Sequence, residues 1–329
     1  MNNAKIHVLS ISDDTYFCGL VATLASLIEH CSRAHDLVVH VLDGGLSSEH
    51  RETISRCAAT RHSLVEFHSV DQTLFDHLAP WHGTSKMTYA RLMTPEVLHD
   101  VQQVIYCDSD VLWEADVCLL WEQRSDAYSL QYVRDASRPH WNDTAEDQWL
   151  NDHRLSLDRE NYFCAGLLLM NLAKFRAEAL LKKAFDLLGE TGGKATYADQ
   201  TVLNVVFSTR TDTRALPAEW QIGSSDRKML AEGKTRGVIH FAGDCPWKPL
   251  RETNHLLTDL HLMWHRIYAA TVGISTWQSL RESNSCAMIV LGRALYLAIC
   301  HLPFFKRLLS AFLRLQGKDS AFLDSVFRC

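Results

Sequence analysis

The chain lacks the motifs with which the commonest nucleotide-binding enzymes hold phosphates. Neither G-x-G-x-x-G nor G-x-x-x-x-G-K-[ST] occurs in its 329 residues, so a dinucleotide-binding fold and a P-loop have no support. Its ten cysteines include no C-x-x-C pair and no zinc-finger spacing. Several of them, such as Cys107 and Cys164, stand in apolar stretches, which predicts free thiols in a reducing, cytoplasmic compartment.

Long apolar runs are also missing. The longest extends from Cys286 to Cys300 and is interrupted by Arg293, so it is shorter than the roughly 20 residues that cross a bilayer. The N-terminal stretch has no apolar h-region before the polar residues that begin at Ser12. We therefore expect neither a spanning helix nor a secretory signal peptide.

A positive net charge, which nucleic-acid binders usually have, is absent. The chain has 33 Lys and Arg against 39 Asp and Glu, a net charge of −6, so nucleic acid is not an expected partner. The charge is uneven, because the segment from Arg281 to Cys329 has seven basic and three acidic residues. An apolar content of 47% is enough for one large domain or two smaller ones.

In the first half of the chain, short β-branched runs alternate with stretches of helical periodicity. This pattern is typical of an α/β protein with a mainly parallel sheet. The polar segment 134–161 is expected to be a long surface excursion and is a candidate lid. We predict strands at 5–11, 37–42, 64–70, 102–107, 162–172 and 236–243, and helices at 17–31, 47–59, 88–99, 173–189 and from 199 onward.

The strongest chemical signal is Asp108-Ser109-Asp110, the only D-x-D triplet in the chain, at the end of an apolar strand. Side chains two apart in an extended segment point to the same side, so the two carboxylates can share one hard cation such as Mn²⁺ or Mg²⁺. Open α/β sheets bind ligands beyond the carboxyl ends of their strands. The alternative is an ordinary solvated strand end.

Other candidate residues each have a purely structural alternative. Asp13 and Asp14 follow the first strand and can bind a ligand, but acids at a helix start also complement the helix dipole. His240, at a later strand end, is a candidate third metal ligand or a packed histidine. Asp199 can simply cap a helix, and Arg91 can be an ordinary surface arginine.

Six segments have an order and separations that, taken together, point to one family. They are SDDTY, TYARL, YCDSDVLW, FCAGLLLMN, ADQTVLN and IHFAGDCPWK. Over residues 5–250 the chain resembles glycosyltransferase family 8, the retaining enzymes that include bacterial lipopolysaccharide and lipooligosaccharide galactosyl- and glucosyltransferases. The resemblance implies a GT-A fold, in which helices flank a Rossmann-like mixed sheet. It also implies Mn²⁺ or Mg²⁺ as cofactor and UDP-galactose or UDP-glucose as donor.

The resemblance further implies roles for individual residues. Asp108, Asp110 and His240 match the metal ligands, and Ser109 stands beside the ribose. Gln200 matches the residue under the anomeric carbon, with Asp199 next to it. The remaining implied contacts are Ile11, Ser12, Asp13, Asp14, Thr15 and Tyr16 around the uracil and ribose, Arg91 and Asp135 at the donor sugar, and Cys164, Ala165, Gly166, Gly243 and Lys248 elsewhere in the donor site.

The expected reaction is a metal-dependent, retaining transfer of a hexose to a saccharide acceptor, such as lipopolysaccharide core or a related surface glycan. A neutral Gln200 is a poor nucleophile, which favours attack from the leaving-group face. A non-catalytic UDP- or saccharide-binding protein stays open, because Cys164 replaces a usual Asn and Lys248 lies two positions beyond the usual lysine. A D-x-D phosphohydrolase would have Thr where this chain has Leu112.

The C-terminal segment mixes bulky apolar side chains with positive charge. Residues 286–316 contain four Lys or Arg, one His and no acid, which suits a helix at the interface of an anionic membrane. The alternative is a terminal helical pair packed on the domain. We expect a GT-A domain over 1–275 and a basic, apolar helical extension over 276–329, placed peripherally on the cytoplasmic face of the membrane.

Overall fold

A computed structural model of the chain describes residues 5–283, except 80–84, 136–142, 225, 227–228, 230–236, 244 and 249–254. The chain divides into two compact units, Met1–Ala242 and Gly243–Cys329. The predicted boundary at 275/276 stays a prediction. The candidate membrane segment at 286–316 lies outside the described residues.

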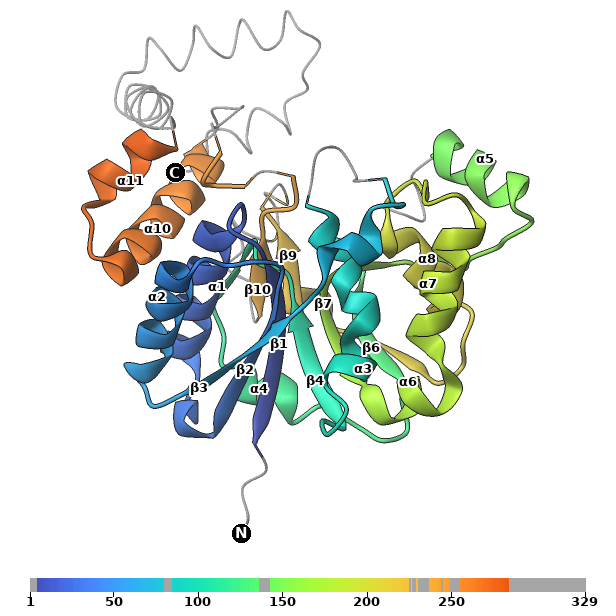
Figure 1. Cartoon of the computed structure of the whole chain (residues 1–329), viewed down its shortest axis with the longest axis horizontal. Coiled ribbons are helices and arrows are strands. Elements are labelled where there is room, and N and C mark those ends of the chain that lie inside the picture. The colour runs from blue at the N-terminus through green and yellow to red at the C-terminus, as the bar shows by residue number, and fades with distance from the viewer. Residues whose placement is uncertain are drawn as a thin grey trace, which may run out of the picture. The chain divides into compact units, whose positions relative to one another are not determined.

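The larger unit is built on a seven-stranded mixed sheet with the order β3-β2-β1-β4-β7-β6-β8 (Figure 1). Strands β1 to β4 run parallel, whereas β7 is antiparallel to both β4 and β6. The strands are β1 Ile6–Ser12, β2 Leu37–Asp43, β3 Leu64–Ser69, β4 Gln103–Cys107, β6 Leu130–Arg134, β7 Phe163–Asn171 and β8 Thr213–Leu216. The mixed, helix-flanked sheet confirms the predicted fold class, and it is mainly parallel as expected, because only β7 runs against the other strands.

A second sheet of three short strands lies in the same unit. Its order is β5-β10-β9, with bounds Val111–Trp113, Val238–His240 and Gln221–Gly223. β10 is antiparallel to β5 and parallel to β9. The sequence pattern predicted β10, as part of a longer strand at 236–243, but it did not predict β5 or β9.

The helices of the larger unit flank the seven-stranded sheet (Figure 1). They are α1 Phe17–His30, α2 Ser48–Ala59, α3 Thr94–Val97, α4 Val117–Trp121, α5 Thr144–Asp152, α6 Leu172–Glu178, α7 Leu180–Glu190 and α8 Asp199–Phe207. Helix α1 follows its apolar spacing and buries Leu20, Leu24 and Leu27. The hydroxyl of Ser47 caps α2 by accepting a bond from the backbone N–H of His50 at 3.3 Å.

Two predicted helices are divided in the structure. The segment expected as one helix at 88–99 is a 3-10 helix, Lys86–Met93, followed by the short α3, because Pro95 lacks the N–H that a continuous helix needs. The helix expected at 173–189 is split into α6 and α7 at Ala179, whose φ of +51° ends the first helix.

The described residues of the segment 134–161 lie mostly at the surface, as predicted, but they include a helix that was not predicted. Helix α5 forms there, with Trp149 and Leu150 buried. The carboxylate of Glu146 is fully buried and is held by Arg159 at 2.5 Å and by the hydroxyl of Thr201 at 2.9 Å. Polar composition therefore misled the prediction, because a buried acid can be compensated by an ion pair and hydrogen bonds.

The second unit is described mainly through α10, His255–Val272, and α11, Thr276–Glu282. The imidazole Nδ1 of His265 on α10 lies 2.7 Å from the hydroxyl of Ser279 on α11, and this contact joins the two helices. Within the part of the chain that the structure describes, no helix is long and apolar enough to cross a bilayer. Among the described cysteines, Cys31, Cys57, Cys107, Cys118 and Cys164 are free thiols, as predicted.

Candidate active site

The register of the small sheet brings a histidine to the D-x-D triplet. Asp108 follows β4, and its backbone N–H donates to the carbonyl of Gly166 on β7 at 3.0 Å. Val111, the first residue of β5, lies opposite His240 on the antiparallel β10. The hydroxyl of Thr23 on α1 donates to the carbonyl of Val111 at 2.8 Å, so α1 fixes the strand that follows Asp110.

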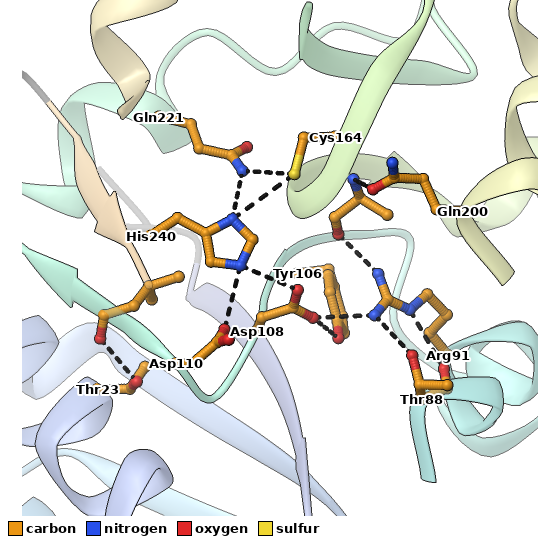
Figure 2. A network of polar contacts seen from close by, with 12 residues as sticks. Thr23, Thr88, Arg91, Tyr106, Asp108, Asp110, Cys164, Gln200, Gln221 and His240 are labelled. Carbon is orange, nitrogen blue, oxygen red and sulfur yellow. Dashed lines mark hydrogen bonds and ion pairs between the residues drawn. The ribbon is translucent and has the colours of Figure 1, made fainter. Parts of the chain in front are cut away.

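Two carboxylates and one imidazole converge at this point (Figure 2). Nε2 of His240 lies 3.1 Å from Oδ1 of Asp110 and 3.6 Å from Oδ2 of Asp108. One ligand atom from each of the three side chains lies within 4.8 Å of the others. The structure thus brings together all three residues that the sequence resemblance matched to metal ligands.

The charged groups of the cluster shift the pKa values of one another. Burial, the largest single influence, would lower the pKa of His240, but the charges and hydrogen bonds of Asp110 and Cys164 together raise that pKa well above the usual value. Burial would likewise raise the pKa of Asp110, but the charge and hydrogen bond of His240 lower it. In the absence of a metal, a proton on the imidazole therefore compensates part of the negative charge.

The other side of the His240 ring is packed against β7 and β9. Its Nδ1 lies 2.9 Å from the side-chain amide of Gln221 and 3.6 Å from Sγ of Cys164. Gly166 leaves room for the ring, since a Cβ there would lie 2.4 Å from Cε1 of His240. Cys164 thus contacts the imidazole of a candidate metal ligand.

Arg91 joins the cluster to the rest of the site. Its Nη2 lies 2.9 Å from Oδ1 of Asp108, its Nε 2.6 Å from Oδ2 of Asp199, and its Nη1 donates to the carbonyl of Ala165 at 2.7 Å. Its side chain is only 5% exposed, so it is not the ordinary surface arginine that the sequence left open. The hydroxyl of Tyr106 donates to the same Oδ1 of Asp108 at 2.5 Å.

Asp199 and Gln200 open helix α8 and point toward β7 and Arg91. The cap position belongs to Ala198, so the alternative that Asp199 is a simple cap is wrong. Burial raises the pKa of the Asp199 carboxyl, and the charge of Arg91 offsets this only in part. Oε1 of Gln200 accepts a bond from the N–H of Ala165 at 3.0 Å. Arg91 therefore binds the carbonyl of Ala165, and Gln200 binds its N–H (Figure 2).

The acids after β1 stabilise the turn into α1. Oδ1 of Asp13 accepts bonds from the N–H groups of Thr15 at 2.9 Å and Tyr16 at 3.1 Å, and its other oxygen accepts the hydroxyl of Ser85. Oδ1 of Asp14 accepts a bond from the backbone N–H of Ser47 at 2.9 Å, which lowers the pKa of Asp14. Ile11, Ser12 and Ser109 are buried beside these strand ends.

The sequence also predicted donor-site roles for Asp135, Gly243 and Lys248, which lie in other segments of the chain. Asp135 follows β6, and its backbone N–H donates to the carbonyl of Tyr162 at 3.0 Å. Gly243, with a φ of +79°, and Lys248 belong to the second compact unit. Their roles in the donor site stay predictions.

Sequence reasoning missed several residues of the site. Tyr106 lies two residues before Asp108 on an extended strand, and Thr88 lies about one helical turn before Arg91, so spacing alone could have indicated both. The hydroxyl of Thr88 donates to Asp199 at 2.8 Å. Gln221 and Thr23 had no such signal, because only the tertiary structure brings them to the site.

Comparisons with known proteins are consistent with this geometry. A family model described as "Glycosyl transferase family 8" matches residues 7–252, close to the 5–250 of the sequence resemblance. The chain is 22% identical over 206 residues to "General stress protein A" of Bacillus subtilis (strain 168), covering 61% of this chain and 69% of that protein. It is 23% identical over 252 residues to "Lipopolysaccharide 1,2-glucosyltransferase" of Escherichia coli, covering 71% of each.

Among solved structures, one similar fold is that of the galactosyltransferase LgtC in complex with donor and acceptor sugar analogues. The TM-score is 0.65 at 22% sequence identity, covering 83% of this chain and 99% of LgtC. At this identity the likeness establishes a shared fold.

Proposed function

This chain belongs to glycosyl transferase family 8, and we propose that it transfers galactose or glucose from a UDP-sugar to a saccharide acceptor with retention of configuration. Enzymes of this family generally use a divalent metal and a nucleotide sugar. The convergence of Asp108, Asp110 and His240 at the carboxyl end of β4 is the observation that carries the proposal.

The donor set of the cluster fits Mn²⁺ or Mg²⁺. Carboxylate oxygens are the ligands that these hard cations prefer, and one imidazole is compatible with Mn²⁺. Asp110 already favours a proton on His240 in place of a cation. Asp108, Asp110 and His240 would hold the ion, which when bound would stabilise the negative charge on the departing diphosphate.

Arg91 and Tyr106 orient Asp108 for this role. Both donate to Oδ1 of Asp108, whereas Oδ2 faces His240 at 3.6 Å. Oδ2 is then the oxygen available to a cation. Arg91 also links Asp108 to Asp199, so one guanidinium connects the metal cluster with the start of α8, where Gln200 lies.

Gln221 would fix the orientation of His240. A ligating Nε2 requires the proton on Nδ1, and a ligating histidine donates that proton to a second group. Oε1 of Gln221 is buried and has no hydrogen-bond partner among the described residues. At present Nε2 of Gln221 lies 2.9 Å from Nδ1 of His240. Turning the amide by 180° exchanges its nitrogen and oxygen and would place Oε1 near Nδ1.

Gln200 supports attack from the leaving-group face. Its amide oxygen accepts the N–H of Ala165 at 3.0 Å, and a neutral amide is a weaker nucleophile than a carboxylate. The nearby carboxylate of Asp199 is paired with Arg91 and Thr88. A sugar found covalently attached to Asp199 in a trapping experiment would contradict this assignment.

For the acceptor we propose lipopolysaccharide core or a related surface glycan at the cytoplasmic face of the membrane. The similarity to a lipopolysaccharide glucosyltransferase supports this class, and the basic, apolar composition of 286–316 supports peripheral contact with anionic lipid. Truncation after Ser283 keeps α11 and should release the protein from anionic liposomes. Unchanged sedimentation of the truncated chain would contradict the membrane contact.

The direct test of the reaction is UDP release from a panel of UDP-sugars with Mn²⁺, Mg²⁺ or EDTA. We expect one hexose donor to turn over, with loss of activity in EDTA and in the Asp108→Asn, Asp110→Asn double variant. UDP and Mn²⁺ binding without turnover of any donor, with or without saccharide acceptors, would instead favour the non-catalytic binding protein. Hydrolysis of an aryl phosphate would favour the phosphohydrolase.

A further inference from the structure

A second group of potential metal ligands crosses the three strands at one edge of the large sheet. His40 on β2 and Glu66 on the edge strand β3 are register partners, and His68 lies two residues beyond Glu66. Side chains two apart on a strand share a face, so the three side chains meet on one side of the sheet. His7 on β1 continues the row, with Nδ1 2.9 Å from Nε2 of His40.

The ligand atoms of this edge cluster, His40, Glu66 and His68, converge on one point. Nδ1 of His40 lies 3.1 Å from Nε2 of His68 and 3.2 Å from Oε2 of Glu66, and the latter two atoms are 4.0 Å apart. Ligand atoms around a tetrahedral zinc ion with bonds of about 2.0–2.1 Å are about 3.4 Å apart. The observed distances lie on both sides of that value, so small side-chain shifts would suffice.

Hydrogen bonding alone does not explain this convergence. Nδ1 of His40 either carries one hydrogen, which it can donate fully to only one of the two neighbours, or accepts a hydrogen from Nε2 of His68, which leaves the carboxylate oxygen of Glu66 facing a nitrogen without a hydrogen. A cation would satisfy all three atoms at once. His7 would then be the outer partner that the second nitrogen of a ligating histidine normally has.

The imidazoles of the row are available as ligands near neutral pH. Burial, and secondarily the neighbouring imidazoles, lower the pKa of His40 to about 3. Burial also lowers the pKa of His7 and of His68. Metal binding requires neutral imidazole, so protons do not compete strongly for these nitrogens.

We propose that the edge cluster binds a divalent late transition-metal ion, Zn²⁺ above all, through His40, Glu66 and His68. Two imidazoles and one carboxylate are a known protein ligand set for zinc, with a fourth position open to water. The same set has more nitrogen and less carboxylate oxygen than Mg²⁺ prefers. The ion would link the edge strand β3 to β2. Its ligands are not residues of the candidate active site.

The test uses the full chain with Asp108→Asn and Asp110→Asn, so that the candidate active site does not compete for the metal. Titration with Co²⁺ should give the visible absorption of a low-symmetry, four- or five-coordinate site at one equivalent, and Zn²⁺ should displace it. In this background His68→Ala and Glu66→Gln should each weaken Co²⁺ binding about tenfold or more, and His7→Phe about tenfold. Glu66 and His68 have side chains 45% and 23% exposed, so these variants should fold.

The matched control is His99→Ala, which removes an exposed histidine 3.0 Å from an acid, Asp100. It should leave the Co²⁺ affinity unchanged. As a second measurement, Zn²⁺ should raise the melting temperature of the parent and of His99→Ala but not that of His68→Ala. An absence of Co²⁺ absorption, or equal affinity of His68→Ala and His99→Ala, would overturn the proposal without bearing on the transferase reaction.

Discussion

Two buried histidines in the larger unit have opposite affinities for protons. His240 and His40 are 6% and 2% exposed, so burial is nearly the same for both. Asp110 and Cys164 raise the pKa of His240, whereas burial and two further imidazoles lower the pKa of His40 to about 3. The charges around a buried histidine therefore decide its protonation state more than the extent of its burial does.

The two clusters also differ in their numbers of carboxylates and imidazoles, which predicts that they bind different cations. The cluster of Asp108, Asp110 and His240 has two carboxylates and suits a hard ion beside a diphosphate. The edge cluster has two imidazoles and one carboxylate and suits zinc.

Removal of one carboxylate should nearly abolish the reaction at the first cluster. Asp110→Asn should lower the rate of Mn²⁺-dependent UDP release on the order of 10³-fold, because the charge that stabilises the leaving diphosphate is lost. The matched variant Asp186→Asn changes an acid of α7 that pairs with Lys182 and should keep the wild-type rate. Equal rates for the two variants would contradict the assignment of Asp110.

Removal of the Arg91 guanidinium, which connects the first cluster to α8, should destabilise the fold. Arg91→Met leaves the buried Asp199 without its partner at 2.6 Å, and should lower the free energy of unfolding by about 3 kcal/mol. Adding Asp199→Asn should restore part of that loss. Urea unfolding followed by tryptophan fluorescence measures both, with the exposed Arg61→Met as control. An unfolding midpoint of Arg91→Met equal to that of the control would count against this prediction.

The lowered pKa of His40 should make the metal-free fold sensitive to acid. Between pH values of about 6.5 and 3 the unfolded chain binds a proton at this position that the folded chain does not, so stability falls as the pH decreases. Measured in EDTA, His40→Gln should reduce the slope of unfolding free energy against pH by about 1 kcal/mol per pH unit. An unchanged slope in this range would show that His40 titrates normally.

A methyl group added at Gly166 should weaken metal binding at the first cluster and leave metal binding at the edge cluster unchanged. In Gly166→Ala the new Cβ would lie 2.4 Å from Cε1 and 2.7 Å from Nδ1 of His240, so the ring must move, and Mn²⁺ affinity should fall about tenfold. Co²⁺ binding at the edge cluster should not change. Gly189→Ala is the control, because nothing lies within 4 Å of its added Cβ. Wild-type Mn²⁺ affinity in Gly166→Ala would mean that His240 is not a ligand.

Much of the fold was predictable because its long elements have strong patterns. The strands β1, β2, β3, β4 and β7 and the helix α1 lie within two residues of their predicted bounds. The short strands β5, β8 and β9 were missed because three or four residues carry no clear periodicity. Helix α5 was missed because its segment is rich in polar residues, among them Glu146, whose carboxylate is buried and paired with Arg159.

The candidate site was predictable only in part. Its carboxylates and His240 were found through strand ends and the family resemblance, and the antiparallel register of β5 and β10 is what brings them together. The central position of Arg91 was not visible from spacing, because its three partners come from β7, from the residue after β4 and from α8. Gln221 and the edge cluster depend on contacts between strands that no local pattern encodes.

The most direct test of the account is Mn²⁺ binding in the presence and absence of UDP, followed by electron paramagnetic resonance of the free ion. The account predicts that UDP strengthens Mn²⁺ binding to the wild-type chain and that Asp110→Asn loses this binding, whereas His68→Ala keeps it. Binding of Mn²⁺ and UDP to Asp110→Asn as tight as to the wild type would contradict the claim that Asp108, Asp110 and His240 form the donor site.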